Sequence, residues 1–161
     1  MTPLSPDDRR HLARAVALSR EHMQAGAGGP FGAVIARSGA VLAEGWNQVT
    51  STNDPTAHAE VVAIRRACAE VRSFALEGAT LYTSCEPCPM CLASAYWARL
   101  SRIVYANTRE DAAAIGFDDA MIYEEIAKPP TERPLPTIHA PSAEARAVFS
   151  DWAEKADRVA Y

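Results

Sequence analysis

The chain has 161 residues, of which 48% are hydrophobic and 22% are charged, a size and balance that fit one compact globular domain over residues 1–161. Its 16 basic and 20 acidic residues give a net charge of −4. The basic residues are scattered, which argues against nucleic acid as a partner and favours a small-molecule substrate. No run is apolar enough to span a membrane, and the first residues lack the pattern of a signal peptide, so we expect a cytoplasmic protein.

The first half of the chain predicts a helix, a hairpin and a second helix. Apolar residues at helical spacing favour a helix over 7–25, which opens with acidic residues where the helix dipole favours negative charge. A glycine-rich break follows, and the apolar runs 31–36 and 41–46 flank a Ser-Gly turn, which indicates a hairpin. Residues 51–56 have the composition of a loop, and we expect the next helix over 58–71.

In the second half of the chain, strands and helices alternate. Residues 115–127 fit no single pattern, and the proline-rich segment 128–136 is expected to be irregular. Strands alternating with helices after a hairpin indicate a three-layer α/β domain. The expected elements are a strand over 79–83, a helix over 89–98, a strand over 102–106, a helix over 109–114 and a closing helix over 142–159 capped by Ser142.

Two short motifs at predicted helix starts indicate the chemistry. His58 and Glu60 form a His-x-Glu motif, and Cys88 and Cys91 form a Pro-Cys-x-x-Cys motif thirty residues later. Cysteines three apart lie on one side of a helix. One imidazole and two thiolates leave the fourth position of Zn²⁺ open for water, which is the catalytic form of such a site. The paired motifs are the signature of zinc-dependent deaminases of bases and nucleosides.

Glu60 is placed for general acid–base work, moving protons between the attacking water, a ring nitrogen and the leaving amine. The helix starts favour anions and lower cysteine pKa values, and one Zn²⁺ per chain would bring the pKa of a bound water to roughly 7. Cys85 and Cys68 are expected to be buried thiols. The alternative is a structural zinc module with four protein ligands, for which Cys85 is the nearby candidate, although its spacing requires an awkward turn.

Beyond these motifs the sequence resembles the cytidine-deaminase-like superfamily and, within it, bacterial guanine deaminases. The resemblance is dense from about residue 45 to 126 and weaker elsewhere. Gly-Phe-Asp-Asp at 116–119 is the block that narrows the resemblance from the superfamily to the bacterial guanine deaminases. The other matching blocks are Asn-Gln-Val-Thr at 47–50, Asp-Pro-Thr-Ala-His-Ala-Glu at 54–60, Tyr-Thr-Ser-Cys-Glu-Pro-Cys-Pro-Met-Cys at 82–91 and Ala-Tyr-Trp-Ala-Arg at 95–99.

The resemblance implies a five-stranded mixed sheet between helices, and a homodimer whose C-terminal segments, about 140–161, are exchanged between subunits. The implied reaction is hydrolysis of guanine to xanthine and ammonia. In this sequence Asn47 would bind the base and Asp119, rather than its neighbour Asp118, would recognise a purine N–H. The other residues implied at the base are Phe31, which would stack on the ring, Ala59, and Trp97 and Tyr161, which would help close the pocket of the partner subunit. The backbone N–H of Cys88 would support the tetrahedral centre of the reaction.

Other aminated rings stay open as substrates at this point, among them guanosine, cytosine and the triazine ammeline. A free base has N9–H where a nucleoside has ribose, so an acceptor such as Asp119 would exclude nucleosides. A tRNA adenosine deaminase is the less favoured alternative, because the charge balance does not fit a polyanion.

Overall fold

The computed structural model describes residues 3–160, and the chain divides after Asp119 into two compact units. The first unit contains the sheet and the helices α1 to α5. The second unit contains only helical elements. No helix in the described part of the chain has both the length and the apolar character needed to cross a membrane.

The sheet of the first unit is mixed and has four strands in the order β2-β1-β3-β4. β1 pairs with β2 and β3 in antiparallel fashion, and β3 pairs with β4 in parallel. The predicted hairpin and the two later strands are thereby confirmed. The strands are β1 (Gly32–Arg37), β2 (Ala40–Trp46), β3 (Ala79–Cys85) and β4 (Arg102–Asn107).

The prediction of a fifth strand was wrong for the described residues. Directly after β4, Thr108 caps α5 (Arg109–Ala114): its side chain accepts a hydrogen bond from the N–H of Asp111, whose carboxylate accepts one from the Thr108 N–H. The chain is therefore turned into a helix where another strand could begin. Farther along, the prolines between residues 129 and 141 cannot donate the backbone hydrogen bonds that a sheet needs.

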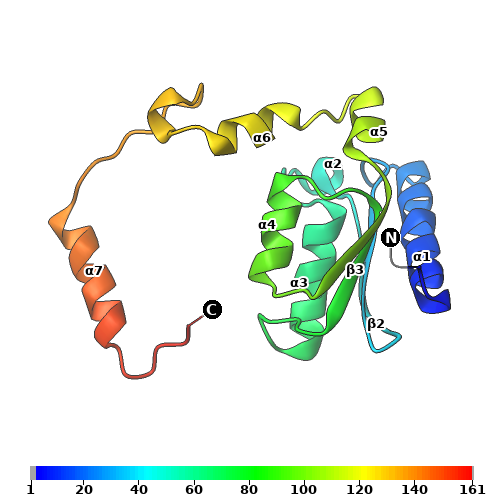
Figure 1. Ribbon diagram of the computed structural model, residues 1–161, viewed down its shortest axis with the longest axis horizontal. Helices are drawn as coiled ribbons and strands as arrows, with labels where there is room; N and C mark the ends of the chain where they lie inside the picture. The colour runs from blue at the N-terminus through cyan, green and yellow to red at the C-terminus, as the bar shows by residue number, and fades with distance from the viewer. Residues whose placement is uncertain (1–2, 161) are drawn as a thin grey trace. The chain divides into compact units, whose positions relative to one another are not determined.

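Helices cover both faces of this sheet, as the three-layer prediction requires. α1 (Pro6–Gln24) lies on one face, and α3 (Ala59–Val71) and α4 (Pro89–Trp97) lie on the other (Figure 1). The predicted helices agree with these bounds to within two residues. The predicted loop over 51–56 differs, because a short helix, α2 (Val49–Thr52), occupies its first part.

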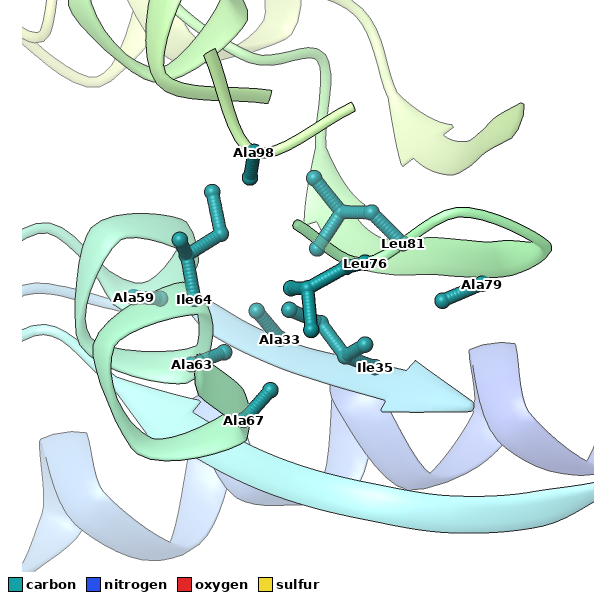
Figure 2. Packing of buried hydrophobic residues seen from close by; sticks show 10 residues of the cluster. All are labelled: Ala33, Ile35, Ala59, Ala63, Ile64, Ala67, Leu76, Ala79, Leu81 and Ala98. Carbon is teal, nitrogen blue, oxygen red and sulfur yellow. The ribbon is translucent and has the colours of Figure 1, made fainter. Parts of the chain in front are cut away.

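The main core lies between the sheet and α3 and is built largely from small side chains (Figure 2). Ala59, Ala63 and Ala67 recur every four residues and are fully buried, so the helix packs closely on the strands. Gly45 of β2 permits the closest approach, since a Cβ there would lie 2.3 Å from the carbonyl oxygen of Ala59. This contact fixes the start of α3, where the His-x-Glu motif lies.

α1 is fastened to the opposite face of the sheet by one buried carboxylate. Asp8 forms a capping box with Ser5, accepts a hydrogen bond of 2.8 Å from the Tyr82 hydroxyl, and pairs with Arg102. Hydrogen bonds from the backbone of Ser5 and from Tyr82 lower the pKa of Asp8 to about 2 despite its burial. The acidic residue expected at the helix start therefore also joins α1 to β3 and β4.

In the second unit, the predicted closing helix is present but ends early. α7 (Ala143–Glu154) starts after Ser142, whose hydroxyl accepts a hydrogen bond from the Ala145 N–H as predicted. α6 (Ala120–Ala127) and a 3-10 turn, η1 (Pro130–Glu132), precede it. Arg133 donates hydrogen bonds to the carbonyl oxygens of Glu125, in the last turn of α6, and of Lys128, directly after it. None of the residues in α6 and α7 is buried.

Candidate metal centre and base-binding residues

The His-x-Glu motif lies at the start of α3. His58 is the N-cap residue, with extended backbone angles, and its side chain makes no capping hydrogen bond. Its imidazole is therefore free of the local role that N-cap side chains usually have. Glu60 follows within the first turn and is buried, with 6% of its surface exposed. Side chains two positions apart on a helix do not face each other, but His58 and Glu60 are within electrostatic reach of each other.

The Cys-x-x-Cys motif has the same arrangement at the start of α4. Cys88 is the N-cap residue, again without a capping hydrogen bond from its side chain, and Cys91 is fully buried one turn later. Both Sγ atoms lie 3.5 Å from Nδ1 of His58. Two helix starts from separate parts of the chain thus bring one nitrogen and two sulfur atoms together.

These distances fit a zinc ion. Zn–S and Zn–N bonds of about 2.3 and 2.0 Å in tetrahedral geometry place the sulfur and nitrogen atoms about 3.5 Å apart. All three ligand atoms lie within 4.8 Å of one another, and this group of three is the metal-capable cluster found among the described residues. Three soft or borderline ligands without a fourth side chain are typical of a catalytic zinc site rather than a structural one.

Cys85 does not join this group. It is buried at the end of β3, as predicted, and its thiol donates a weak hydrogen bond to the carbonyl oxygen of Thr108 at 3.4 Å. Burial raises the pKa of Cys85 to about 11, which keeps it a thiol. Cys68 is partly buried and packs against the main core. The four-ligand structural module therefore has no support from this arrangement.

The electrostatics of the three ligands favour one thiolate before any metal binds. Hydrogen bonding from Cys91, and then from His58, lowers the pKa of Cys88 to about 4 against the effect of burial. The contact with the Cys88 thiolate raises the pKa of His58. The pKa of Cys91 is raised because its thiol proton is held by Cys88 and because it is buried. Metal binding must displace that proton, so metal affinity will rise with pH.

Glu60 has the character expected of a general acid–base. Burial raises its pKa, and the negative charge of Cys88 raises it further. A buried carboxyl group whose pKa is raised holds a proton more readily than a free one, which suits a group that must accept a proton and return it. Its position next to the three ligands agrees with the predicted role.

Asn47 lies at the end of β2 and is buried. Its Oδ1 accepts hydrogen bonds of 3.2 Å from the backbone N–H groups of Gly29 and Val49. These two bonds fix the orientation of the side-chain amide, so its NH₂ group is the end that can donate a hydrogen bond to a ligand. The bond from Val49 is the turn role that the position of Asn47 allows, and the bond from Gly29 adds a longer-range constraint on the same side chain.

Phe31 is half-buried, and its ring meets Phe117 edge-to-face with the centroids 4.9 Å apart. Phe117 belongs to the Gly-Phe-Asp-Asp block, so this contact brings the block next to the strand that begins at Gly32. Two residues later, burial raises the pKa of Asp119, and the neighbouring Cys88 adds to the effect. The predicted base-recognising aspartate is thus within electrostatic reach of the metal ligands.

The remaining residues that were predicted to contact the base differ in how far they are exposed. Trp97, at the end of α4, is 68% exposed. Ala59 is fully buried as the first residue of α3, so contact with a base would fall to its backbone. Tyr161 lies outside the described residues. Sequence reasoning missed Phe117 and Gly29 as parts of this region, although the Gly-Gly pair at 28–29 marked a place where backbone approaches another group closely.

The comparison with known families agrees with this geometry. Residues 5–107 match the cytidine and deoxycytidylate deaminase zinc-binding region, and the matched region includes His58, Glu60, Cys88 and Cys91. The chain therefore belongs to this family of zinc-dependent deaminases, and the predicted fold class and zinc requirement are confirmed.

Comparison with individual relatives and solved structures shows which members of this family the chain resembles. Guanine deaminase of Bacillus subtilis is 52% identical over 150 residues, which cover 93% of this chain and 96% of that protein. Its crystal structure superposes with a TM-score of 0.93 at 51% identity, covering 95% of this chain and 98% of the other. A structure solved in complex with 2,6-diaminopurine has 32% identity and a TM-score of 0.67, covering 73% of this chain and 65% of the other. A tRNA-specific adenosine deaminase of Aquifex aeolicus is 28% identical, covering 78% and 81%.

Proposed function

We propose that this protein hydrolyses guanine to xanthine and ammonia. The proposal rests on one observation: the cluster of His58, Cys88 and Cys91 lies beside the buried carboxyl group of Glu60. That cluster supports hydrolytic deamination, and the near full-length similarity to a guanine deaminase supports guanine as the base. The complex of a more distant relative with 2,6-diaminopurine supports a purine pocket in the same fold.

Zinc held by the three ligands would supply a water activated for attack near neutral pH. The protein's own part in the chemistry is proton transfer by Glu60. Glu60 would take one proton from the attacking water and deliver it to a ring nitrogen. It would then take the remaining hydroxyl proton of the adduct and give it to the amino group, so that the carbonyl forms as ammonia leaves. Its burial keeps bulk water away from these transfers, which strengthens the electrostatic interactions of the site.

Recognition of the base would fall to groups on both sides of the ring. Asn47 would donate from its fixed NH₂ group, and Asp119 would accept from a purine N–H. Because a free base has N9–H where a nucleoside has ribose, an acceptor at that position excludes nucleosides. Further proposed contacts are the ring of Phe31, the side chain of Trp97, the backbone of Ala59 and, beyond the described residues, Tyr161.

We further propose a cytoplasmic homodimer that exchanges its C-terminal segments, about 140–161. The support is the exposed apolar side of α7, where Val148 and Phe149 are 62% and 79% exposed and Trp152 is 46% exposed. Apolar residues gathered on one exposed helix usually mark a surface that another chain covers. Size measurement by light scattering tests the dimer.

The substrate proposal is tested by measuring ammonia release from guanine, guanosine, cytosine, adenine and ammeline with the zinc-loaded protein. The proposal expects guanine to be preferred by orders of magnitude in kcat/KM. A preference for another ring would replace the substrate while keeping the reaction. One bound zinc with no release from any ring would favour a non-catalytic module, and salt-sensitive binding of tRNA in a gel shift would favour the tRNA-modifying relatives.

A further inference from the structure

One loop contacts both Asn47 and Phe117, the residue two positions before Asp119. Residues 26–31, here called the glycine loop, lie against Asn47: the Gly29 N–H donates to its Oδ1 at 3.2 Å, and the Asn47 N–H donates to the Phe31 carbonyl at 3.0 Å. A Cβ on Gly28 would lie 2.3 Å from the Asn47 carbonyl oxygen. The loop backbone and Asn47 are therefore fixed to each other.

Phe117 packs on the other side of the same loop. Its ring meets Phe31 at an interplanar angle of 89°, and a Cβ on Gly29 would lie 3.2 Å from the Phe117 Cζ and 3.3 Å from Phe31. The absence of a side chain at Gly29 is thus what allows the ring of Phe117 to lie against the loop. The Phe117 N–H also donates to the Ala112 carbonyl at 3.0 Å, which holds its backbone to the end of α5.

Phe117 is two residues before Asp119, and the residues around it are largely exposed. We propose that Phe117 is a positioning residue that, by packing on Gly29 and Phe31, sets the separation between Asn47 and Asp119. This inference rests on the proposed function, because it assigns Phe117 to the recognition of the base. It adds a residue that is neither a predicted metal ligand nor the proposed proton carrier.

The expected effect follows from the strength of the contact. An edge-to-face aromatic pair contributes about 0.5–1.5 kcal/mol beyond its buried area, which corresponds to roughly 2- to 13-fold in a binding constant. The ligands and Glu60 lie at the starts of α3 and α4, so the chemical step itself is untouched. Loss of the contact should therefore raise KM for guanine while kcat stays nearly constant, the pattern of lost uniform binding.

The test is a double-mutant cycle on the zinc-loaded full chain with Gly29→Ala, Phe117→Leu and the two combined. Gly29→Ala should raise KM because the added methyl group displaces the Phe117 ring. Phe117→Leu should raise KM by roughly 2- to 13-fold. The double variant should raise KM by less than the product of the two single effects, because without the Phe117 ring the added methyl group meets only Phe31. Ile115→Ala, a neighbouring exposed position (60%), should leave KM unchanged.

Hydrogen exchange of the glycine loop gives a second measurement that needs no substrate. Phe117→Leu should speed exchange within 26–31 while zinc content stays at the level of the unchanged protein, and Ile115→Ala should not. Additive KM effects, an unchanged KM in Phe117→Leu, or a fall in kcat instead would each overturn the inference. If the unchanged protein does not act on guanine, the proposed function fails by itself, and unaltered exchange in Phe117→Leu is then the result that rejects the coupling.

Discussion

The unit that ends at Asp119 and the unit that follows it handle apolar residues in opposite ways. The first buries two clusters of apolar side chains, one on each face of the sheet. In the second, α6 and α7 bury none of theirs. The first unit thus contains what it needs to hold the metal ligands, Glu60 and Asn47. The exposed apolar side chains of the second unit are the basis for the proposal that another chain covers α7.

The largest effect should come from removing the proton carrier in the first unit. Glu60→Gln should leave the fold and the zinc content intact but lower kcat by about 10²–10⁴-fold, because no other carboxyl group replaces the transfer. Steady-state kinetics together with metal analysis measure this. Glu70→Gln, an exposed position on the same helix, is the matched control. Near-normal turnover in Glu60→Gln would remove Glu60 from the mechanism.

A pair of leucines compares the two units directly. Leu81 is fully buried in β3, whereas Leu135 is 79% exposed in the second unit. Leu81→Ala should lower the free energy of unfolding by about 2–5 kcal/mol through the cavity it leaves. Leu135→Ala should change it by less than about 0.5 kcal/mol. Denaturant unfolding measures both, and a large loss in Leu135→Ala would show that another surface covers this side chain.

The apolar side of α7 offers the next test. If a second copy covers Phe149, then Phe149→Ser should weaken association by about 1.5–3 kcal/mol, or roughly 10- to 100-fold in the dimer dissociation constant. Light scattering over a dilution series measures this. Glu154→Ser, at the exposed end of the same helix, should associate like the unchanged protein. A protein that is monomeric before any substitution would reject the dimer.

The last prediction concerns the attachment of α1, whose contribution to stability changes only in acid. The pKa of Asp8 is lowered to about 2, whereas an unfolded chain has about 3.9. The ionised carboxylate therefore stabilises the fold above about pH 4 and loses this contribution, about 2–3 kcal/mol in total, as the pH falls through 2. Asp8→Asn should be less stable at neutral pH and should lack this pH dependence. A curve parallel to that of the unchanged protein would contradict the assignment, and Asp7→Asn is the exposed control.

The sequence predicted those features that depend on residues close together in the chain. The metal cluster was predictable because each motif fixes its ligands at one helix start and the residue types point to one ion. The attachment of α1 was not, since Asp8 meets Tyr82 and Arg102 from 74 and 94 residues away. The contact between Phe31 and Phe117 could not be predicted either, because these two residues are also far apart in the sequence. The fifth strand failed because it was expected from resemblance, without a matching apolar run.

The two N-cap positions of α3 and α4 place a limit on any attempt to evolve this protein toward greater stability. His58 and Cys88 occupy sites where serine, aspartate or asparagine would stabilise a helix by about 1 kcal/mol each, and neither side chain makes a capping bond. A selection that rewards only folding would therefore favour the better caps and eliminate the metal centre. Screening libraries in a zinc chelator would accelerate that loss, whereas a simultaneous screen for turnover would prevent it.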